Sequence, residues 1–299
     1  MDAQAGQMPE AIVEGYLDSL LFQVENSMDG DAISFCGPIT YGADDLVREE
    51  IEDIRGKRSR LIVILETNGG YIEVAQRLAD TFRHHYNIVE FVVPNYAMSA
   101  GTVLVMSGDA IHMDYYSILG PIDPQTQKAG GQFIPALGYL EKYNTLIEKS
   151  YTDDISAAEV AYLIAKFDPA EMYQFEQARE LSISLLKEWL VKYKFKDWHK
   201  TETRGVTVTQ KMKQQRAQMI AKILNRTDRW HTHGRGISMH VLRNELNLRI
   251  EDFEEGSHGA SVKEYYRLLK SYMMRRGWEA VFHRNTKCIP LSYMEGIAP

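Results

Sequence analysis

Residues 60–70 read RLIVILETNGG, a run of apolar residues that ends in a pair of glycines. A continuous run of this length, rich in β-branched residues, is typical of a parallel strand that is buried on both faces of a sheet. Residues 71–84 follow with the apolar spacing of a helix, and residues 88–93 form a second buried run. The order strand, helix, strand predicts parallel strands joined by a right-handed crossover, and hence an α/β layer fold.

The alternation of helices and strands extends on both sides of this unit. Before it we expect an amphipathic helix, a short strand and a second helix, over residues 10–26, 32–35 and 43–54. After it we expect a helix that begins at or near Ser99 and a strand over 110–113. From residue 135 onward the spacing is helical, with expected helices over 135–150, 156–167, 169–195, 206–224, 238–247 and 260–276. The chain therefore divides into an N-terminal amphipathic helix, an α/β core and a helical extension, over residues 1–29, 30–150 and 151–299.

The composition is that of an ordinary globular protein, with 44% apolar and 25% charged residues. A net charge of −7 does not favour nucleic acid or an anionic membrane as a partner. Cys36 and Cys288 lack a Cys-x-x-Cys spacing, which fits a reducing compartment without structural disulfides. No signal-peptide pattern begins the sequence, and no apolar run is long enough to span a bilayer. We expect a soluble, cytoplasmic protein.

The first candidate site is the turn Thr67-Asn68-Gly69-Gly70, which follows the first buried run. A Gly-Gly pair lets the backbone turn sharply and leaves its amide N–H groups unobstructed beside a helix N-terminus, where anions bind. The alternative is a tight strand-to-helix turn with no further role. Neither GxGxxG nor GxxxxGK[ST] occurs, so no nucleotide cofactor is predicted.

The second candidate site is Ser99, which lies between a strand and a helix and is flanked by small residues. A serine at such an elbow projects its hydroxyl above the sheet edge, and the amide of the next residue points into the same space. The alternative is that Ser99 caps the helix that follows it, a common role for serine. Because adjacent parallel strands end at the same edge, we expect the amides of Gly70 and Ala100 to converge near Ser99 as an oxyanion hole.

Three segments in this order resemble the core of the Clp-type proteases, and more closely their signal-peptide-peptidase A branch. They are FCGPIT (35–40), LIVILETNGGYIEVAQRLADTF (61–82) and NYAMSAGTVLVMSGDAIHMDYYSILGPIDPQ (95–125). The string GPIDPQ (120–125) is similar to the group named serine dehydrogenase proteinases, and residues 227–250 resemble the closing segment of the family. The resemblance implies a Clp-protease/crotonase-like fold, homo-oligomers and hydrolysis of peptides or unfolded protein segments. It places the nucleophile at Ser99 and the oxyanion donors at Gly70 and Ala100, with Gly69 beside them.

The base that activates Ser99 is less well defined. Clp proteases carry a histidine about two dozen residues after the serine, but this chain has Ile122-Asp123-Pro124 there. The signal-peptide-peptidase branch uses a lysine 40–50 residues after the serine, and such a lysine works only if burial lowers its pKa. We favour Lys142 over two other lysines, Lys128 and Lys149, although each of the three is also an ordinary surface lysine. A triad of Ser99, His233 and Asp123 is a further alternative.

Two other functions remain open from the sequence. In a crotonase-type acyl-CoA enzyme the same amides would hold a thioester enolate without a serine nucleophile. In an inactive scaffold the helical extension would bind a protein partner through Trp189, Tyr193, Phe195 and Trp198, residues that are equally typical of a core. His231 and His233 have no third acidic or thiol ligand at a suitable spacing, so we predict no metal site.

Overall fold

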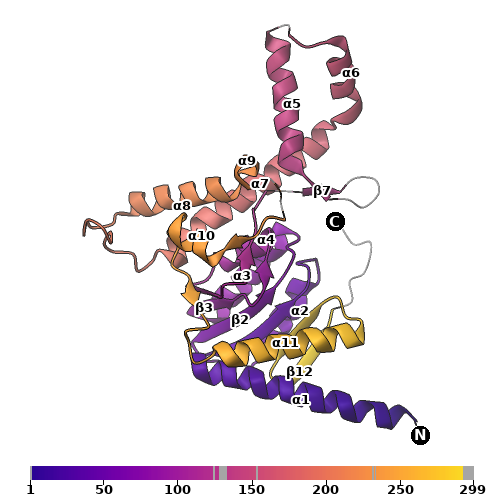
Figure 1. The fold of residues 1–299 in the computed structure, drawn as a ribbon, viewed down its shortest axis with the longest axis vertical. Helices are drawn as coiled ribbons and strands as arrows, with labels where there is room; N and C mark the ends of the chain where they lie inside the picture. Colours follow the sequence, from indigo (N-terminus) through magenta and orange to yellow (C-terminus); the bar gives the residue numbers. More distant parts are fainter. Residues whose placement is uncertain are drawn as a thin grey trace.

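The computed structural model describes residues 2–123, 125–127, 133–152, 154–230, 232 and 234–291. Its centre is a seven-stranded sheet in the order β10-β5-β3-β2-β1-β11-β12 (Figure 1). The five strands from β10 to β1 are parallel, and β11 and β12 are antiparallel to their neighbours. The strands are β1 (Asp31–Cys36), β2 (Arg60–Glu66), β3 (Ile88–Val92), β5 (Ala110–Met113), β10 (Glu251–Asp252), β11 (Val281–Arg284) and β12 (Lys287–Pro290).

Both faces of the sheet are covered by helices, which explains the continuous apolar run of β2. Leu61, Val63 and Leu65 belong to the core under α2 (Ala43–Glu52), α3 (Ile72–His85) and α4 (Ala100–Val105). Ile62 and Ile64 point to the opposite face and pack with α1 (Asp2–Met28) and α11 (Gly259–Arg276). Leu17, Leu20, Leu21 and Val24 of α1 are therefore buried within the chain, whereas Ile12 and Tyr16 near its start are exposed.

A smaller sheet extends beyond the carboxyl ends of the parallel strands. In it β4 (Tyr96–Ala97) pairs with β6 (Ile118–Leu119), and β6 pairs with β9 (Ile237–Ser238). β9 leads into α10 (Met239–Asn244), and α9 (Thr227–Trp230) precedes it. Through β9, the segment 227–250, which resembles the closing segment of the Clp-type proteases, thus belongs to the same small sheet as β4, the strand that leads to Ser99, with β6 between the two.

The helical extension has a part that packs on the core and a part that projects from it. α7 (Pro169–Trp189) packs against α3 and α4, and α8 (Gln210–Leu224) packs against α7 and the π-helical turn η1 (Leu190–Lys194) that follows it. Trp189 and Phe195 are buried there, so these aromatic side chains belong to the core and do not form a partner surface. The hairpin β7 (Gln125–Gln127) and β8 (Phe133–Pro135) leads to α5 (Ala136–Tyr151), which projects away together with α6 (Ala157–Lys166) (Figure 1).

The predicted α/β fold with a parallel core and a helical extension is confirmed. Elements up to residue 113 lie within a few residues of their predicted bounds, apart from α1, which begins earlier. The helices predicted over 206–224 and 238–247 are shorter, at Gln210–Leu224 and Met239–Asn244. Strand β4 and strands β6 to β12 were not predicted. The division into residues 1–29, 30–150 and 151–299 stays a prediction.

Candidate active site

The two candidate turns lie side by side, as predicted from the neighbouring strands β2 and β3. The Thr67 amide donates to the carbonyl of Tyr96 at 3.1 Å, and the Met98 amide donates to the carbonyl of Thr67 at 2.9 Å. These two hydrogen bonds extend the parallel pairing of the strands into the turns. They fix the Gly-Gly turn relative to Ser99.

Ser99 has the backbone of a strained elbow. Its φ of 52° and ψ of −119° lie in a region that non-glycine residues rarely adopt. It occupies the N-cap position of α4, but its side chain makes no capping hydrogen bond. Among the side chains that the structure describes, the half-buried Ser99 hydroxyl has no hydrogen-bond partner. The hydroxyl is therefore not used as a helix cap.

The glycine pair brings backbone directly against this serine. Gly69 and Gly70 have φ values of 98° and 147°, in the region that favours glycine. A Cβ atom on Gly69 would lie 2.7 Å from Ser99 Cβ, and one on Gly70 would lie 2.1 Å from the carbonyl oxygen of Ile39. Only glycine fits at these two positions.

The amides of the two turns differ in their partners. The Gly69 amide donates to Thr67 Oγ1 at 3.0 Å, so Gly69 contributes space beside Ser99 and its donor is already used. Among the described residues, neither the Gly70 amide nor the Ala100 amide has a hydrogen-bond acceptor. Two neighbouring N–H groups without an acceptor are what an oxyanion hole requires.

The segment after β5 forms a further wall of the site. The Thr102 hydroxyl donates to the Ala97 carbonyl at 2.7 Å and accepts from the Gly120 amide at 2.9 Å. A Cβ on Gly120 would lie 2.7 Å from Met98 Cε, so this segment packs closely on the elbow. Asp123 follows and is only 2% exposed.

The candidate bases are in different environments. Lys142 is exposed on α5. Lys149 pairs with Glu159 at 2.7 Å, and this hydrogen bond raises the pKa of Lys149, which opposes a role as a base. Lys128 and His233 lie outside the described residues. The structure therefore weakens Lys149, whereas the choice among Lys142, Lys128 and His233 stays a prediction.

Burial lowers the pKa of another lysine, Lys194, to about 8. Its ammonium group lies 3.4 Å from the carbonyl oxygen of Asp109, the residue before β5 begins. Ser99 instead follows the carboxyl end of β3. Asp109 lies at the amino ends of the parallel strands and Ser99 at their carboxyl ends, so Lys194 is not placed to act on Ser99.

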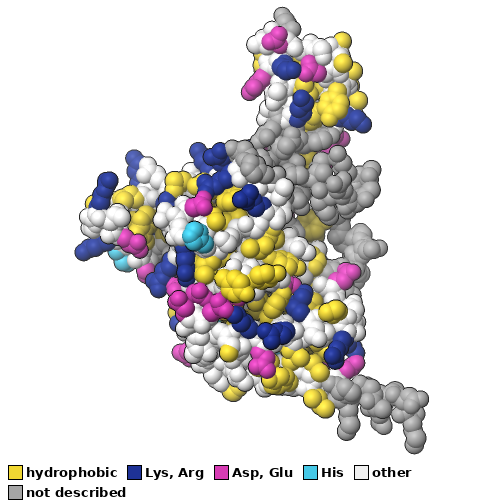
Figure 2. Space-filling model, in the orientation of Figure 1, with side chains coloured by type: hydrophobic (Ala, Val, Ile, Leu, Met, Phe, Trp, Pro, Cys, Tyr) yellow, Lys and Arg dark blue, Asp and Glu magenta, His cyan; other side chains and the backbone are white. Residues whose placement is uncertain are grey.

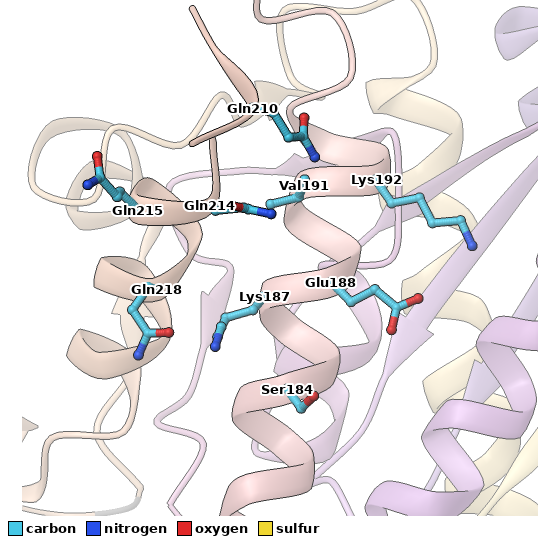
Figure 3. Close-up of a pocket in the computed structure, with 9 residues that line it drawn as sticks. All are labelled: Ser184, Lys187, Glu188, Val191, Lys192, Gln210, Gln214, Gln215 and Gln218. Atoms are coloured by element: carbon cyan, nitrogen blue, oxygen red, sulfur yellow. The ribbon is translucent and has the colours of Figure 1, made fainter. Parts of the chain in front are cut away.

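A groove of about 810 Å³ lies between α7, η1 and α8, away from the two turns in the sequence and the fold. Lys187 points toward α8 across the groove, whereas Glu188 and Lys192 point away from it (Figure 3). None of the lining residues belongs to the Gly-Gly turn or to the elbow. We therefore place the candidate chemistry at Ser99 and not in this groove.

The described residues also bear on metal binding and on membrane spanning. Among the described residues, no three His, Cys, Asp or Glu side chains are grouped so that they would hold a metal ion. None of the described helices combines the length and apolar character needed to cross a membrane. Acidic and basic side chains are mixed over the face shown in Figure 2, with hydrophobic side chains gathered in its middle above α11.

Sequence reasoning missed several residues that support the turns. Thr67 accepts the Gly69 amide with its hydroxyl and the Met98 amide with its carbonyl, and so connects the two turns. Glu66 and Asn95, which precede the two turns, are joined to each other and to α11. A signal was present, because a glutamate that ends a doubly buried strand needs a partner, but the sequence did not indicate which residues supply it.

The chain is similar to several known proteins. A model of the family described as ClpP-like SDH-type serine proteinase matches residues 51–209, a range that includes both turns. Two proteins of Methanocaldococcus jannaschii, Uncharacterized protein MJ1495 and Uncharacterized protein MJ0137, are 29% identical over 130 residues and 40% identical over 63 residues. The matches cover 41% and 21% of this chain and 43% and 22% of the relatives, so the chain spans less than half the length of either.

Two solved structures of the 1510-N membrane-bound stomatin-specific protease, both of variants and one in complex with a substrate peptide, also resemble the chain. Their sequence identities are 14% and 15%, each with a TM-score of 0.42. The matches cover 75% and 74% of this chain, and 80% and 73% of the solved chains.

Proposed function

Because the chain belongs to the family of ClpP-like SDH-type serine proteinases, we propose that it hydrolyses peptide bonds with Ser99 as the nucleophile. The observation that carries this proposal is the strained elbow at Ser99, whose hydroxyl does not cap its helix and lies beside Gly69. The amides of Gly70 and Ala100, which have no acceptor among the described residues, are the proposed oxyanion donors.

The proposed reaction proceeds through an acyl-enzyme. The Ser99 hydroxyl oxygen attacks the carbonyl carbon of the scissile peptide while a base takes its proton, and the two amides stabilise the negative charge on the carbonyl oxygen. The C–N bond then breaks, the base returns the proton to the leaving amine, and the acyl group stays on Ser99 as an ester. Water attacks this ester, gives a proton to the base and releases the acid, and the proton returns to Ser99.

For the base we propose Lys142 on α5. A lysine accepts a proton at neutral pH only when burial or a nearby positive charge lowers its pKa. Lys142 is exposed in this structure. The proposal therefore requires that bound peptide or a second copy of the chain covers Lys142 during the reaction.

The proposal extends to the setting of the reaction. The substrates are peptides or unfolded protein segments, the active form is a homo-oligomer, and the helical extension is the part that we expect to bind a protein partner. Cys36 and Cys288 are both free, which supports a reducing, cytoplasmic setting. No cofactor is part of the proposed reaction.

The nucleophile is tested by labelling with a fluorophosphonate probe, which reacts with activated serines. We expect the wild-type chain to be labelled and to cleave unfolded protein, and Ser99→Ala to lose both by roughly 10⁴-fold or more. Ser107→Ala is the control, because the buried Ser107 hydroxyl donates to the Leu104 carbonyl at 2.7 Å and takes no part in the site. A wild-type chain that is not labelled would exclude the hydrolase and favour a crotonase-type enzyme or a scaffold.

The base is tested by comparing two lysines of α5. We expect Lys142→Met to lower the labelling rate by roughly 10²-fold to 10⁴-fold, the usual contribution of a general base. Lys149→Met should leave the rate near that of the wild type, since Lys149 is paired with Glu159. An unchanged rate in Lys142→Met contradicts the assignment and makes His233→Gln the next variant to measure.

A further inference from the structure

Glu66 is a buried carboxylate at the point where β2 ends and the Gly-Gly turn begins. Its side chain is 3% exposed and lies on the face of the sheet that α11 covers. Lys270 of α11 donates to Glu66 Oε1 at 2.6 Å. Asn95 donates to Glu66 Oε2 at 2.9 Å, and the Tyr266 hydroxyl of α11 donates to the same oxygen.

Asn95 brings the second turn into the same cluster. It lies shortly before Ser99, and its side-chain amide also donates to the Tyr266 hydroxyl at 2.9 Å. Its backbone carbonyl accepts the Ile118 amide at 2.8 Å, which links the elbow to β6. One carboxylate therefore joins the residues that precede both turns to a helix about two hundred positions further along the chain.

The protonation states of Lys270 and Tyr266 allow both side chains to donate hydrogen bonds to Glu66. A buried carboxylate is costly unless charged or polar donors satisfy it. Burial alone would lower the pKa of Lys270, but its contact with Glu66 outweighs this and raises it, so the side chain stays an ammonium. Burial and Glu66 raise the pKa of Tyr266, so its hydroxyl stays a neutral donor.

We propose that Tyr266 and Lys270 are positioning residues for the active site: through Glu66 and Asn95 they hold the Gly-Gly turn and the Ser99 elbow in the relative position that the reaction needs. This inference rests on the proposed function for its effect on rate. Oxyanion donors and a nucleophile act only when held within a fraction of an ångström of their productive geometry. The formation of strand β2 does not itself require a glutamate at the last residue. An apolar side chain could be buried there and would need no hydrogen-bond partner.

A second lysine of α11 provides a matched control. Lys263 is 38% exposed and Lys270 is 40% exposed, and both form an ion pair. Lys263 pairs with Glu254, in the loop before α11, and its ammonium group lies 4.0 Å from Asp114; neither partner is a residue of either turn. Lys263→Met therefore removes a similar charge from the same helix without touching the cluster.

The experiment compares Lys270→Met, Tyr266→Phe, Lys270→Arg and Lys263→Met in the full chain. Fluorophosphonate labelling and peptide cleavage are measured at a temperature well below the thermal unfolding midpoint of each variant, so that all variants are folded. We expect Lys270→Met and Tyr266→Phe to label roughly tenfold to hundredfold more slowly, with kcat lowered and KM little changed. Lys270→Arg should recover part of the loss, and Lys263→Met should match the wild type.

Hydrogen exchange gives a readout that does not depend on activity. The amides of residues 67–70 and 96–100 should exchange faster in Lys270→Met and Tyr266→Phe, but not in Lys263→Met. Equal labelling rates in Lys270→Met and Lys263→Met would overturn the role in rate, and unchanged exchange in the turns would overturn the role in positioning. If the wild-type chain is not labelled, the proposed function fails, and exchange alone decides whether the cluster holds the turns.

Discussion

Ser99 is held in its unfavourable conformation by its neighbours. A residue in such a sparsely populated region costs about 1–3 kcal/mol, which the surrounding structure must offset. The Ser99 carbonyl accepts the Val103 amide at 3.2 Å, and the Met98 carbonyl accepts the Gly101 amide at 2.8 Å. These bonds and the close contact with Gly69 hold the backbone of Ser99 in this conformation, in which its hydroxyl does not cap the helix.

Gly69 offers a direct test of this close contact. An alanine at Gly69, with its φ of 98°, would place Cβ 2.7 Å from Ser99 Cβ and 2.8 Å from the Met98 carbonyl oxygen. We expect Gly69→Ala to displace Ser99 and to lower the rate of fluorophosphonate labelling by roughly 10²-fold, as a misplacement of about 1 Å does.

Gly42→Ala is the control for backbone strain. Gly42 has a similar φ of 89°, but a Cβ there meets nothing within 4 Å. Both variants should lose about 1–2 kcal/mol of unfolding free energy from the left-handed backbone, measured by urea titration, and only Gly69→Ala should lose labelling. If Gly42→Ala also loses labelling, strain and not the contact with Ser99 explains the effect.

At the scale of elements, the sequence predicted those helices and strands whose local apolar pattern is sufficient to define them. Strand β2 was predicted with its observed bounds because both of its faces are buried and every position from Leu61 to Leu65 is apolar. Strand β11 was not predicted, because Val281–Arg284 is short and pairs on one side with β1, some 250 residues earlier. The adjacency of the two turns followed from parallel strand order, whereas the partners of Glu66 depend on how α11 packs, which no local pattern encodes.

The start of α11 contains a group whose protonation opposes folding. His258 precedes the helix, and its ring lies 5.5 Å from the ring of His112 on β5. Burial lowers the pKa of His258, and the neighbouring His112 lowers it further, against a smaller opposing effect of Glu90. Glu90 itself accepts from His112 at 2.9 Å and lies 3.4 Å from Arg60.

Stability should therefore fall as the pH drops through this histidine's unfolded pKa. Because the folded chain binds the His258 proton less tightly than the unfolded chain, stability is full above about pH 6.5 and is lost below it. We expect His258→Gln to lose less unfolding free energy than the wild type between pH 7.5 and pH 5, measured by urea titration at each pH. Parallel curves for the two proteins would contradict this expectation.

At the scale of the whole molecule, burial is unequally distributed. The core on both faces of the sheet contains most of the fully buried side chains, including those of α7 and α8. The projecting helices α5 and α6 share a small separate cluster with the first turns of α7, in which Leu146, Phe167 and Met172 are the buried members. No residue of α6 is buried, and Tyr162 and Ile164 are 46% and 76% exposed.

This distribution predicts that the projecting helices open before the core unfolds. Regions with few buried apolar contacts have the lowest free energy of local opening. Limited proteolysis with thermolysin should therefore cut first within residues 157–166 and leave the rest of the chain folded. Leu146→Ala removes a fully buried side chain from the small cluster. We expect this to lower the free energy of local opening by about 2–5 kcal/mol.

Leu186→Ala separates local from global effects, since Leu186 is equally buried but belongs to the main core. We expect Leu146→Ala to speed the first cleavage while the main melting temperature stays unchanged, and Leu186→Ala to lower that temperature with little change in the first cleavage. α7 runs from the small cluster into the core. If α7 couples the two parts, Leu146→Ala should also lower the main melting temperature. A fall in melting temperature in Leu146→Ala as large as in Leu186→Ala would show that the projecting helices and the core unfold as one unit.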